Sequence, residues 1–197
     1  NHAPKPNWVQ EFFDAGDDYW DSENGLGKNQ IPMFKRFLRE CGLIDLKTGE
    51  TTGLFRTVSR LGWADNTTWG LMLSNLAYNR QCRWYIQNMD CDVYYERDHI
   101  SDLLVLEGVK KDDATSIINA FKRFCELPLG TVLNWGYVET KGRQITTLCR
   151  LKCTVDDKRV ILYSLYLFME KCNMDKEFNV SYLFDESIER DGEIGRA

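Results

Sequence analysis

The stretch that decides the fold is Asp156 to Cys172, DDKRVILYSLYLFMEKC, the most apolar continuous run in the chain. Asp156 or Asp157 can cap a helix here, and Lys171 lies at the end where a cation suits the helix dipole. A helix that is apolar all round is normally surrounded by protein. The run therefore predicts a buried central helix around which the other elements pack. It is too short to span a bilayer, which takes about 20 apolar residues.

The bulk composition is that of a globular protein. The chain has 197 residues, of which 43% are hydrophobic and 28% are charged, and its net charge is −5. This acidity weighs against a dominant nucleic-acid or anionic-membrane footprint, although a local basic patch can survive it. No signal peptide or membrane-spanning run is present, so we expect no membrane partner. The chain begins with Asn1 rather than Met, and we expect it to be a fragment of a longer protein.

The cysteines indicate a reducing compartment. There are seven, an odd number, and none forms a CxxC pair. Most of them fall within apolar or helical patterns, which is typical of buried thiols rather than of a disulfide framework. Cytoplasmic localisation follows as an expectation.

Residues 1–92 predict a helical subdomain. Apolar residues recur at helical spacing in segments near 31–41, 51–61, 67–77 and 84–89. The loop Gly25–Asn29 has two glycines beside a lysine, but it lacks the spacing of a phosphate-binding loop and the strand that precedes one. We interpret it as a tight turn that leads into a helix.

The pattern of residues 93–197 predicts a second subdomain. Alternatively, these residues continue the first subdomain, and the chain forms one domain. A short helix over 100–106 ends at Gly108, and a second helix follows over 112–124, which is helix-turn-helix spacing. Segments 137–139 and 145–151 are β-like and are joined by Lys141-Gly142, which predicts a hairpin. The fold class is therefore mainly α, with a winged-helix-like helix-turn-helix and a small β-hairpin. An apolar segment at 178–184 is expected to pack last.

Basic residues gather in this second subdomain. Such modules bind DNA in many proteins and only mediate protein contacts in many others, so both functions stay open. The candidate nucleic-acid-binding residues are Lys110, Lys111, Lys122, Arg123, Lys141 and Arg143.

Catalytic chemistry has little support in the sequence. Only two histidines exist, and His99 alone lies within a predicted element. Cys149 and Cys153 would lie about 13 Å apart on a straight strand, too far to share a zinc ion. The paired aspartates fall at helix starts or loops, where capping is their usual role. We assign no catalytic and no metal-binding residue, and a free-standing enzyme is the least favoured hypothesis.

Several stretches together resemble the C-terminal region of large bacterial proteins of the phosphoadenosine phosphosulfate (PAPS) reductase family. The resemblance spans nearly the whole chain and rests on these segments: Asn7–Phe13 (NWVQEFF), Gly25–Gly27, Phe37–Leu43 (FLRECGL), Thr68–Gly70, Ile161–Tyr166 (ILYSLY), Val180–Leu183 and Arg190–Gly192.

This resemblance implies a non-catalytic accessory module. In the family, nucleotide chemistry belongs to an α/β domain that is followed by a cysteine-rich iron–sulfur segment, and neither motif occurs in this chain. The module would carry no cofactor, whereas an iron–sulfur cluster could lie in the parent protein. Its expected partner is the N-terminal reductase-like domain of the same parent protein. The module would dock on that domain within one chain or mediate assembly. Relatives linked to sulfur modification of DNA keep DNA open as an alternative partner.

Overall fold

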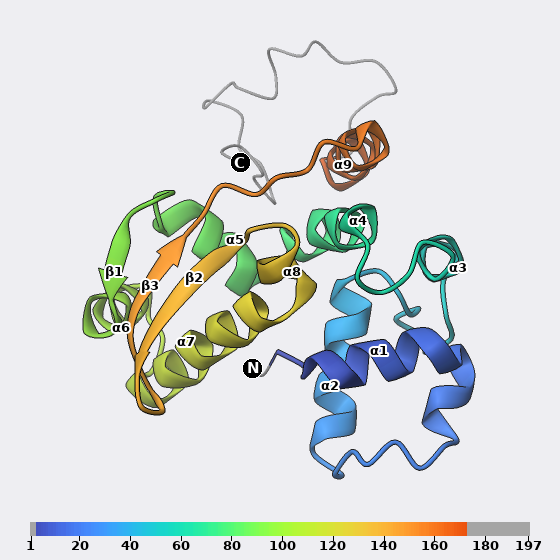
Figure 1. Ribbon diagram of the computed structural model, residues 1–197, viewed down its shortest axis with the longest axis horizontal. Helices are drawn as coiled ribbons and strands as arrows, with labels where there is room; N and C mark the ends of the chain where they lie inside the picture. Colours follow the sequence, from blue (N-terminus) through green and yellow to red (C-terminus); the bar gives the residue numbers. More distant parts are fainter. Residues whose placement is uncertain (1–2, 173–197) are drawn as a thin grey trace.

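The computed structural model describes residues 3–172, which form a mainly helical fold with one small antiparallel sheet (Figure 1). The predicted packing segment at 178–184 lies outside the described residues. The first half is entirely helical, and its elements are α1 Pro6–Ala15, the 3-10 helix η1 Gly16–Trp20, α2 Gln30–Glu40, α3 Gly53–Val58, α4 Asn66–Leu76 and α5 Arg80–Asn88.

The second half adds the sheet and four more helices. The two helices predicted on either side of Gly108 and the predicted hairpin are present, within one or two residues at most ends, whereas the winged-helix arrangement stays a prediction. The elements are β1 Tyr94–Glu96, α6 Arg97–Leu106, α7 Lys111–Glu126, α8 Pro128–Thr131, β2 Gly136–Lys141, β3 Gln144–Arg150 and α9 Lys158–Lys171.

Side-chain caps fix where several helices begin. The Thr52 hydroxyl accepts from the backbone N–H of Phe55 at the start of α3. Asp65 accepts in the same way from Thr68 at the start of α4, and Asn79 opens α5. These caps satisfy backbone donors that a helix start otherwise leaves unpaired.

The sheet has the strand order β1-β3-β2, with both pairings antiparallel. Strand β1 was not predicted, because its three residues are too short for a periodic pattern to emerge. Arg150, at the end of β3, joins the sheet to α5: its Nη1 donates to the carbonyl oxygens of Ile86 at 2.8 Å and Met89 at 3.0 Å. Tyr85 of α5 stacks on Trp135, with ring centroids 4.7 Å apart.

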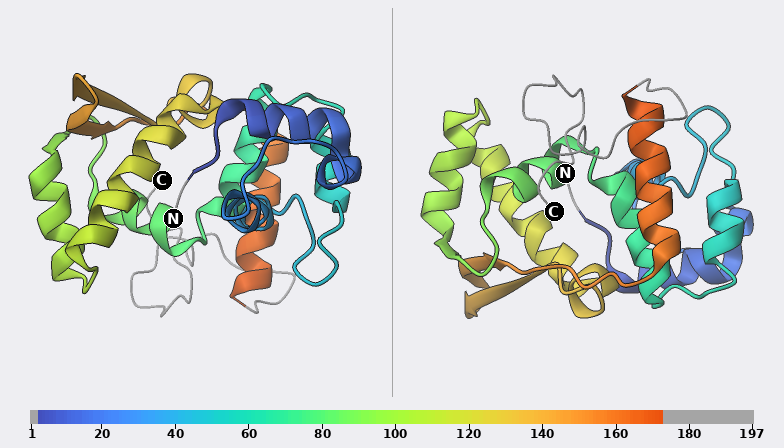
Figure 2. Two further views of the ribbon diagram at one scale, coloured as in Figure 1. Left: turned by 90° about the horizontal axis from the view of Figure 1, so that it is seen from below. Right: turned by 90° about the horizontal axis from the view of Figure 1, so that it is seen from above.

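The helix that is surrounded by protein is α4. Eight of its residues are buried, and they lie on all sides of the helix: Thr67, Thr68, Trp69, Gly70, Leu71, Met72, Ser74 and Leu76. Trp69 is fully buried, and its indole N–H donates to the carbonyl oxygen of Trp63. Helices α1, α2 and α3 lie on one side of α4, and α9 lies on another (Figures 1 and 2).

The prediction that α9 is buried all round is wrong. Only Val160, Leu167 and Phe168 are buried in this helix. Ile161, Leu162 and Tyr166 are 52%, 66% and 61% exposed. Figure 2, in its right-hand view, shows α9 along its whole length, with no described segment in front of it. The helix therefore lies at the periphery and has one packed face.

Small residues explain how α9 packs on α4. A Cβ atom at Gly70 would lie 2.8 Å from Cγ2 of Val160, so the two helices approach as closely as a glycine allows. One turn further on, the hydroxyl oxygens of Ser74 and Ser164 are 2.7 Å apart. The amide nitrogen of Asn75 donates to the hydroxyl of Tyr163 at 3.0 Å. Small and polar groups thus make the contact at this level, whereas the large buried side chains Leu167 and Phe168 lie nearer the end of α9.

The start of α9 is attached to α4 through Asp157. This carboxylate caps α9 by accepting from the backbone N–H of Arg159 at 2.8 Å. It also accepts from the hydroxyl of Thr67 at 2.7 Å. These hydrogen bonds, led by that from the Arg159 side chain, hold the pKa of Asp157 well below its ordinary value.

The predicted boundary between residues 92 and 93 stays a prediction. The buried apolar residues of both halves belong to one continuous cluster, which runs from Ala3 to Val160. Within residues 3–172, no helix combines the length and the apolar character that crossing a membrane requires.

We predict that Gly70→Leu lowers the free energy of unfolding by about 1–3 kcal/mol, because the new side chain forces α9 away from α4. Urea denaturation followed by circular dichroism measures this change. Val160→Ala removes the methyl groups that face Gly70, so the double variant should lose less than the sum of the two single losses. Gly53→Ala is the control, since a Cβ there has its nearest neighbour at 3.7 Å. Strict additivity of the two changes would contradict the close contact.

We predict that Asp157→Asn makes the stability of the protein depend less on pH in the acid range. Because the folded-state pKa is lowered, the carboxylate contributes stability that is fully present above the unfolded value of about 3.9 and is lost as the pH falls below it. The difference in melting temperature between wild type and variant should thus shrink between pH 5 and pH 3, as followed by thermal denaturation. Asp156→Asn, at the exposed neighbouring carboxylate, is the control. A difference that is independent of pH would contradict the assignment.

Candidate functional site

The six basic residues predicted to bind nucleic acid lie in three places. Lys110 precedes α7 and Lys111 begins it, and both are exposed. Lys141 ends β2 and Arg143 lies in the turn of the hairpin, where both are exposed as well. These four cations make no ion pair with any of residues 3–172.

Lys122 and Arg123 are engaged by neighbours. Nζ of Lys122 lies 3.8 Å from a carboxylate oxygen of Glu126, one turn further along α7. Nη1 of Arg123 donates to the carbonyl oxygen of Ala3 at 3.2 Å. Arg123 thus attaches the start of the described chain to α7, and it is less available to a phosphate than the sequence suggested.

Helix α7 offers little open polar surface beyond its first turn. Asn119 and Glu126 are its only exposed residues there. Arg97 of α6 donates to the hydroxyl of Thr115 at 3.3 Å, which covers part of the helix. The predicted second helix of the helix-turn-helix is therefore largely enclosed by its own protein.

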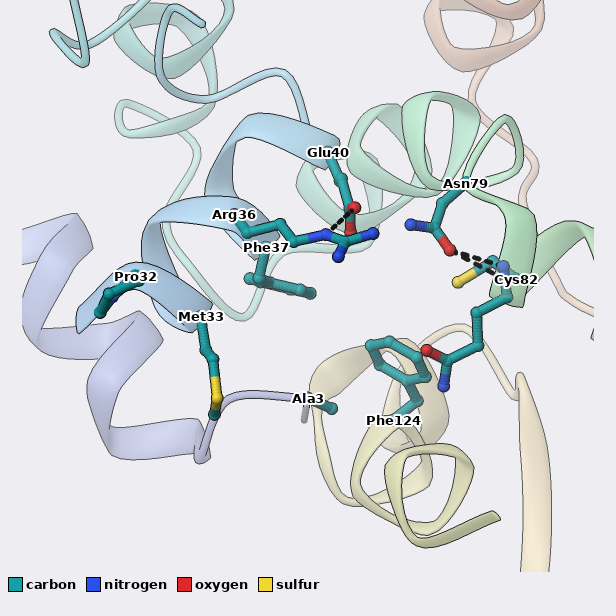
Figure 3. Close-up of a pocket in the computed structure, with 10 residues that line it drawn as sticks. Ala3, Pro32, Met33, Arg36, Phe37, Glu40, Asn79, Cys82 and Phe124 are labelled. Atoms are coloured by element: carbon teal, nitrogen blue, oxygen red, sulfur yellow. Dashed lines mark hydrogen bonds and ion pairs between the residues drawn. The ribbon is translucent and has the colours of Figure 1, made fainter. Parts of the chain in front are cut away.

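Two adjoining hollows lie between the halves of the fold. The smaller, of about 230 Å³, is bounded by Met33 and Phe37 of α2, Cys82 of α5 and Phe124 of α7, with Ala3 beside them (Figure 3). In Figure 3 the side chain of Arg36 reaches toward Glu40, and Nε of Arg36 lies 2.7 Å from the carboxylate of that residue. The wall is therefore mostly apolar, with an ion pair at its rim.

The larger hollow, of about 580 Å³, lies beside the turn between α6 and α7. Three cations line it, namely Arg36, Arg80 and Lys110, and so do Glu107 and Asp113. Arg36, Asn79 and Gln81 line both hollows, which together form one cleft. Since both cations and carboxylates line it, the cleft has no strong preference for one sign of charge.

Two hydrogen-bond donors in the wall of the cleft have no partner within the described chain. They are Nε1 of Trp84 and Nε2 of Gln81. The Trp84 ring stacks on Phe121 with an interplanar angle of 8°. Both nitrogen atoms are buried, so a ligand in the cleft could reach them only if the wall moved. This cleft was not predicted, because its walls come from segments far apart in the chain.

Four of the cysteines are held in the protonated, unreactive form by burial. Burial raises the pKa of Cys41 and of Cys82 well above the ordinary thiol value. Burial likewise raises the pKa of Cys125 to about 12 and that of Cys153 to about 11. Since the thiolate is the reactive form, these groups are inert near neutral pH. Cys91 is the exposed one among the cysteines of the described chain.

Within residues 3–172, His99 and the acidic residues form no recognisable centre. His99 stacks on Tyr95, with ring centroids 5.8 Å apart. In the part of the chain that the structure describes, no three side chains of His, Cys, Asp or Glu are grouped so as to hold a metal ion.

The most distinctive surface is the exposed side of α9, which we call the outer face. It consists of Ile161, Leu162, Leu165, Tyr166 and Met169. Leu162, Leu165, Tyr166 and Met169 recur at the three- and four-residue spacing that lines one side of a helix. Leu165 and Met169 are partly exposed and join the three more exposed residues into one strip. Contiguous apolar surface of this kind commonly marks a site of protein contact.

Comparison with known proteins does not identify the chain. No known family, no curated protein and no solved structure matches it significantly.

Proposed function

We propose that this chain is a non-catalytic accessory module that holds its parent protein in an assembly, with the outer face of α9 as the contact surface. The exposure of Leu162 and Tyr166, at 66% and 61%, is the observation that carries the proposal. Exposed large apolar side chains are costly in water, and burying each is worth about 1.5–3 kcal/mol.

The chemistry of the remaining surface supports a role in assembly rather than in catalysis. The buried thiols are protonated, and the cleft offers mixed charge without a paired nucleophile and base. Apolar packing, by contrast, needs no activated group. The outer face is thus the best equipped surface for a specific function.

The parent protein that we propose resembles a PAPS reductase. The segments quoted above, with ILYSLY of α9 among them, support this part of the proposal. The nucleotide chemistry and any iron–sulfur cluster would then belong to a reductase-like domain elsewhere in the parent, and the assembly would form in the cytoplasm.

Site-specific photo-crosslinking tests the contact surface. A benzoylphenylalanine in place of Tyr166 should form one discrete protein adduct in cells that make the protein. The same substitution at Tyr137, which is 50% exposed on β2, is the matched control and should form none. Leu162→Asp should abolish the adduct from position 166. Absence of an adduct there, or equal adducts from both positions, would contradict assembly through α9.

A nucleic-acid-binding winged helix, linked to DNA sulfur modification, is the second candidate. The element order α5-β1-α6-α7-β2-β3 and the strand order β1-β3-β2 support it, since winged helices place a three-stranded sheet beside three helices in this way. Lys141 and Arg143 at the tip of the hairpin are available to phosphates. The enclosure of α7 weighs against major-groove reading by that helix.

Titration of duplex DNA at low salt tests this alternative. The double variant Lys141→Glu and Arg143→Glu should weaken binding and reduce the slope of log affinity against log salt by about 2. Lys28→Glu, an exposed reversal in the first half of the chain, is the control. Charge reversal at Lys122 and Arg123 should have a smaller effect, because both side chains are engaged. Binding that none of these changes affects would rule out this surface.

A further inference from the structure

We propose that Asn24 is a site of deamidation, where the chain converts its own asparagine to aspartate and isoaspartate and so alters the loop between η1 and α2. The proposal is independent of the assembly function. Asn24 is followed by Gly25, and no other asparagine of the chain precedes a glycine. Asparagine reacts most readily before glycine, because any larger residue hinders the attack of its own backbone nitrogen.

The backbone nitrogen of Gly25 is free to react. Its N–H donates no hydrogen bond to any of residues 3–172. Gly25 is exposed, and a Cβ atom there would have no neighbour within 4 Å apart from the adjoining residues. Its φ of +66° is one that glycine adopts without strain. Water and hydroxide therefore reach this nitrogen, and no side chain crowds it.

Asn29, in the same loop, lacks this arrangement and serves as a comparison. It is exposed as well, but it is followed by Gln30, the first residue of α2. The N–H of Gln30 is engaged, since it donates to the carbonyl oxygen of Gly27 at 2.7 Å. The loop thus contains one asparagine with a free neighbouring nitrogen and one whose neighbouring nitrogen is held.

Two hydrogen bonds hold the side-chain amide of Asn24. Nδ2 donates to the carbonyl oxygen of Tyr19 at 3.0 Å, and Oδ1 accepts from the backbone N–H of Leu26 at 3.1 Å. Both bonds must open before Cγ can turn toward the nitrogen of Gly25. The reaction therefore proceeds through molecules in which this surface loop opens locally, and it is slower in the folded protein than in the unfolded chain.

The reaction needs no reagent other than water. The nitrogen of Gly25 gives up its proton to hydroxide and attacks Cγ of Asn24. The bond from Cγ to Nδ2 breaks, and ammonia leaves with a proton taken from water. The product is a cyclic succinimide. Addition of water at one of its carbonyl groups yields aspartate, and addition at the other yields isoaspartate.

Both products alter the contacts of the loop. A carboxylate cannot donate to the carbonyl oxygen of Tyr19, but that oxygen keeps the hydroxyl of Ser22, which donates to it at 2.8 Å. In isoaspartate the main chain runs through the former side chain, so the hydrogen bond to Leu26 is lost as well. Leu26 packs against the core, and it then depends on apolar contact alone. The loop is therefore loosened while the rest of the fold keeps its contacts.

Peptide mapping by mass spectrometry of the aged 197-residue chain tests the site. We expect Asn24 to gain the mass difference between an amide and an acid, faster at alkaline than at neutral pH, while Asn29 stays unchanged. An Asn24 that stays intact while the urea-unfolded chain converts would overturn the proposal. Equal conversion at Asn29 would also overturn it.

Two glycine variants test the role of the free nitrogen. Gly25→Ala should slow the conversion strongly, because the added methyl group crowds the nitrogen. Gly27→Ala is the matched control in the same loop and should leave the rate unchanged, since a Cβ there has its nearest neighbour at 3.6 Å. Asn24→Gln, which cannot form the same ring, should abolish the mass change even if Gly25→Ala disturbs the loop. A mass change in this peptide that persists in Asn24→Gln would overturn the assignment to Asn24.

The loosened loop has its own test. Asn24→Asp reproduces the aspartate product and should lower the melting temperature by about 2–4 °C, the effect of one lost hydrogen bond in a protein of this size. Asn29→Asp is the control and should not lower it. In aged protein enriched in isoaspartate, the backbone N–H of Leu26 should exchange with solvent faster than in fresh protein. Equally slow exchange in both samples would overturn the proposed effect on the loop.

Discussion

The burial of α4 on all sides is the constraint on which the rest of the structure depends. One helix can be surrounded only if several neighbours approach it, and each needs a complementary surface. Trp69 fills the side of α4 toward Trp63. On the side toward α9, the small residues Gly70 and Ser74 let the two helices approach closely. A helix with both a large aromatic and small residues in one turn can accept neighbours at different depths.

The shallow surface of α4 at Gly70 and Ser74 determines which side chains of α9 can lie between the two helices. Because Gly70 admits the backbone of α9 so closely, the contact at its level is made by Val160, Ser164 and the Tyr163 hydroxyl. Leu162 and Tyr166 lie on the side of α9 opposite Ser164, so they take no part in this contact and stay exposed. The exposed apolar strip is thus the far side of a helix whose near side packs tightly on α4.

Local patterns predicted much of the fold and little of the candidate sites. The helix-turn-helix, the hairpin and the helix over residues 67–77 follow from periodicity and capping residues, which act within a few positions. The orientation of α9 could not be predicted in the same way. The hydrophobicity of a helix indicates that it tends to be buried, but it does not say which neighbouring helix covers it or which of its sides is covered. The serine at 164, aligned with small residues in α4, was the only local signal.

Partners far away in the sequence also decide which basic side chains are engaged in hydrogen bonds. Arg123 bonds the carbonyl of Ala3, 120 positions away, and Arg150 bonds the carbonyls at the end of α5. No spacing rule connects such pairs, and the cleft assembled from α2, α5 and α7 is equally non-local. Lys122, by contrast, bonds Glu126 at the four-residue spacing that a sequence does reveal.

The exposed strip on α9 also has a consequence for the life of the protein in the cell. Chaperones and proteases act on chains that display apolar side chains, and such triage can change the abundance of a protein several-fold. A copy with Ile161, Leu162 and Tyr166 uncovered is open to that surveillance, whereas a covered copy is not. The steady-state amount of this protein should therefore follow its degree of assembly, and surplus copies should turn over fastest.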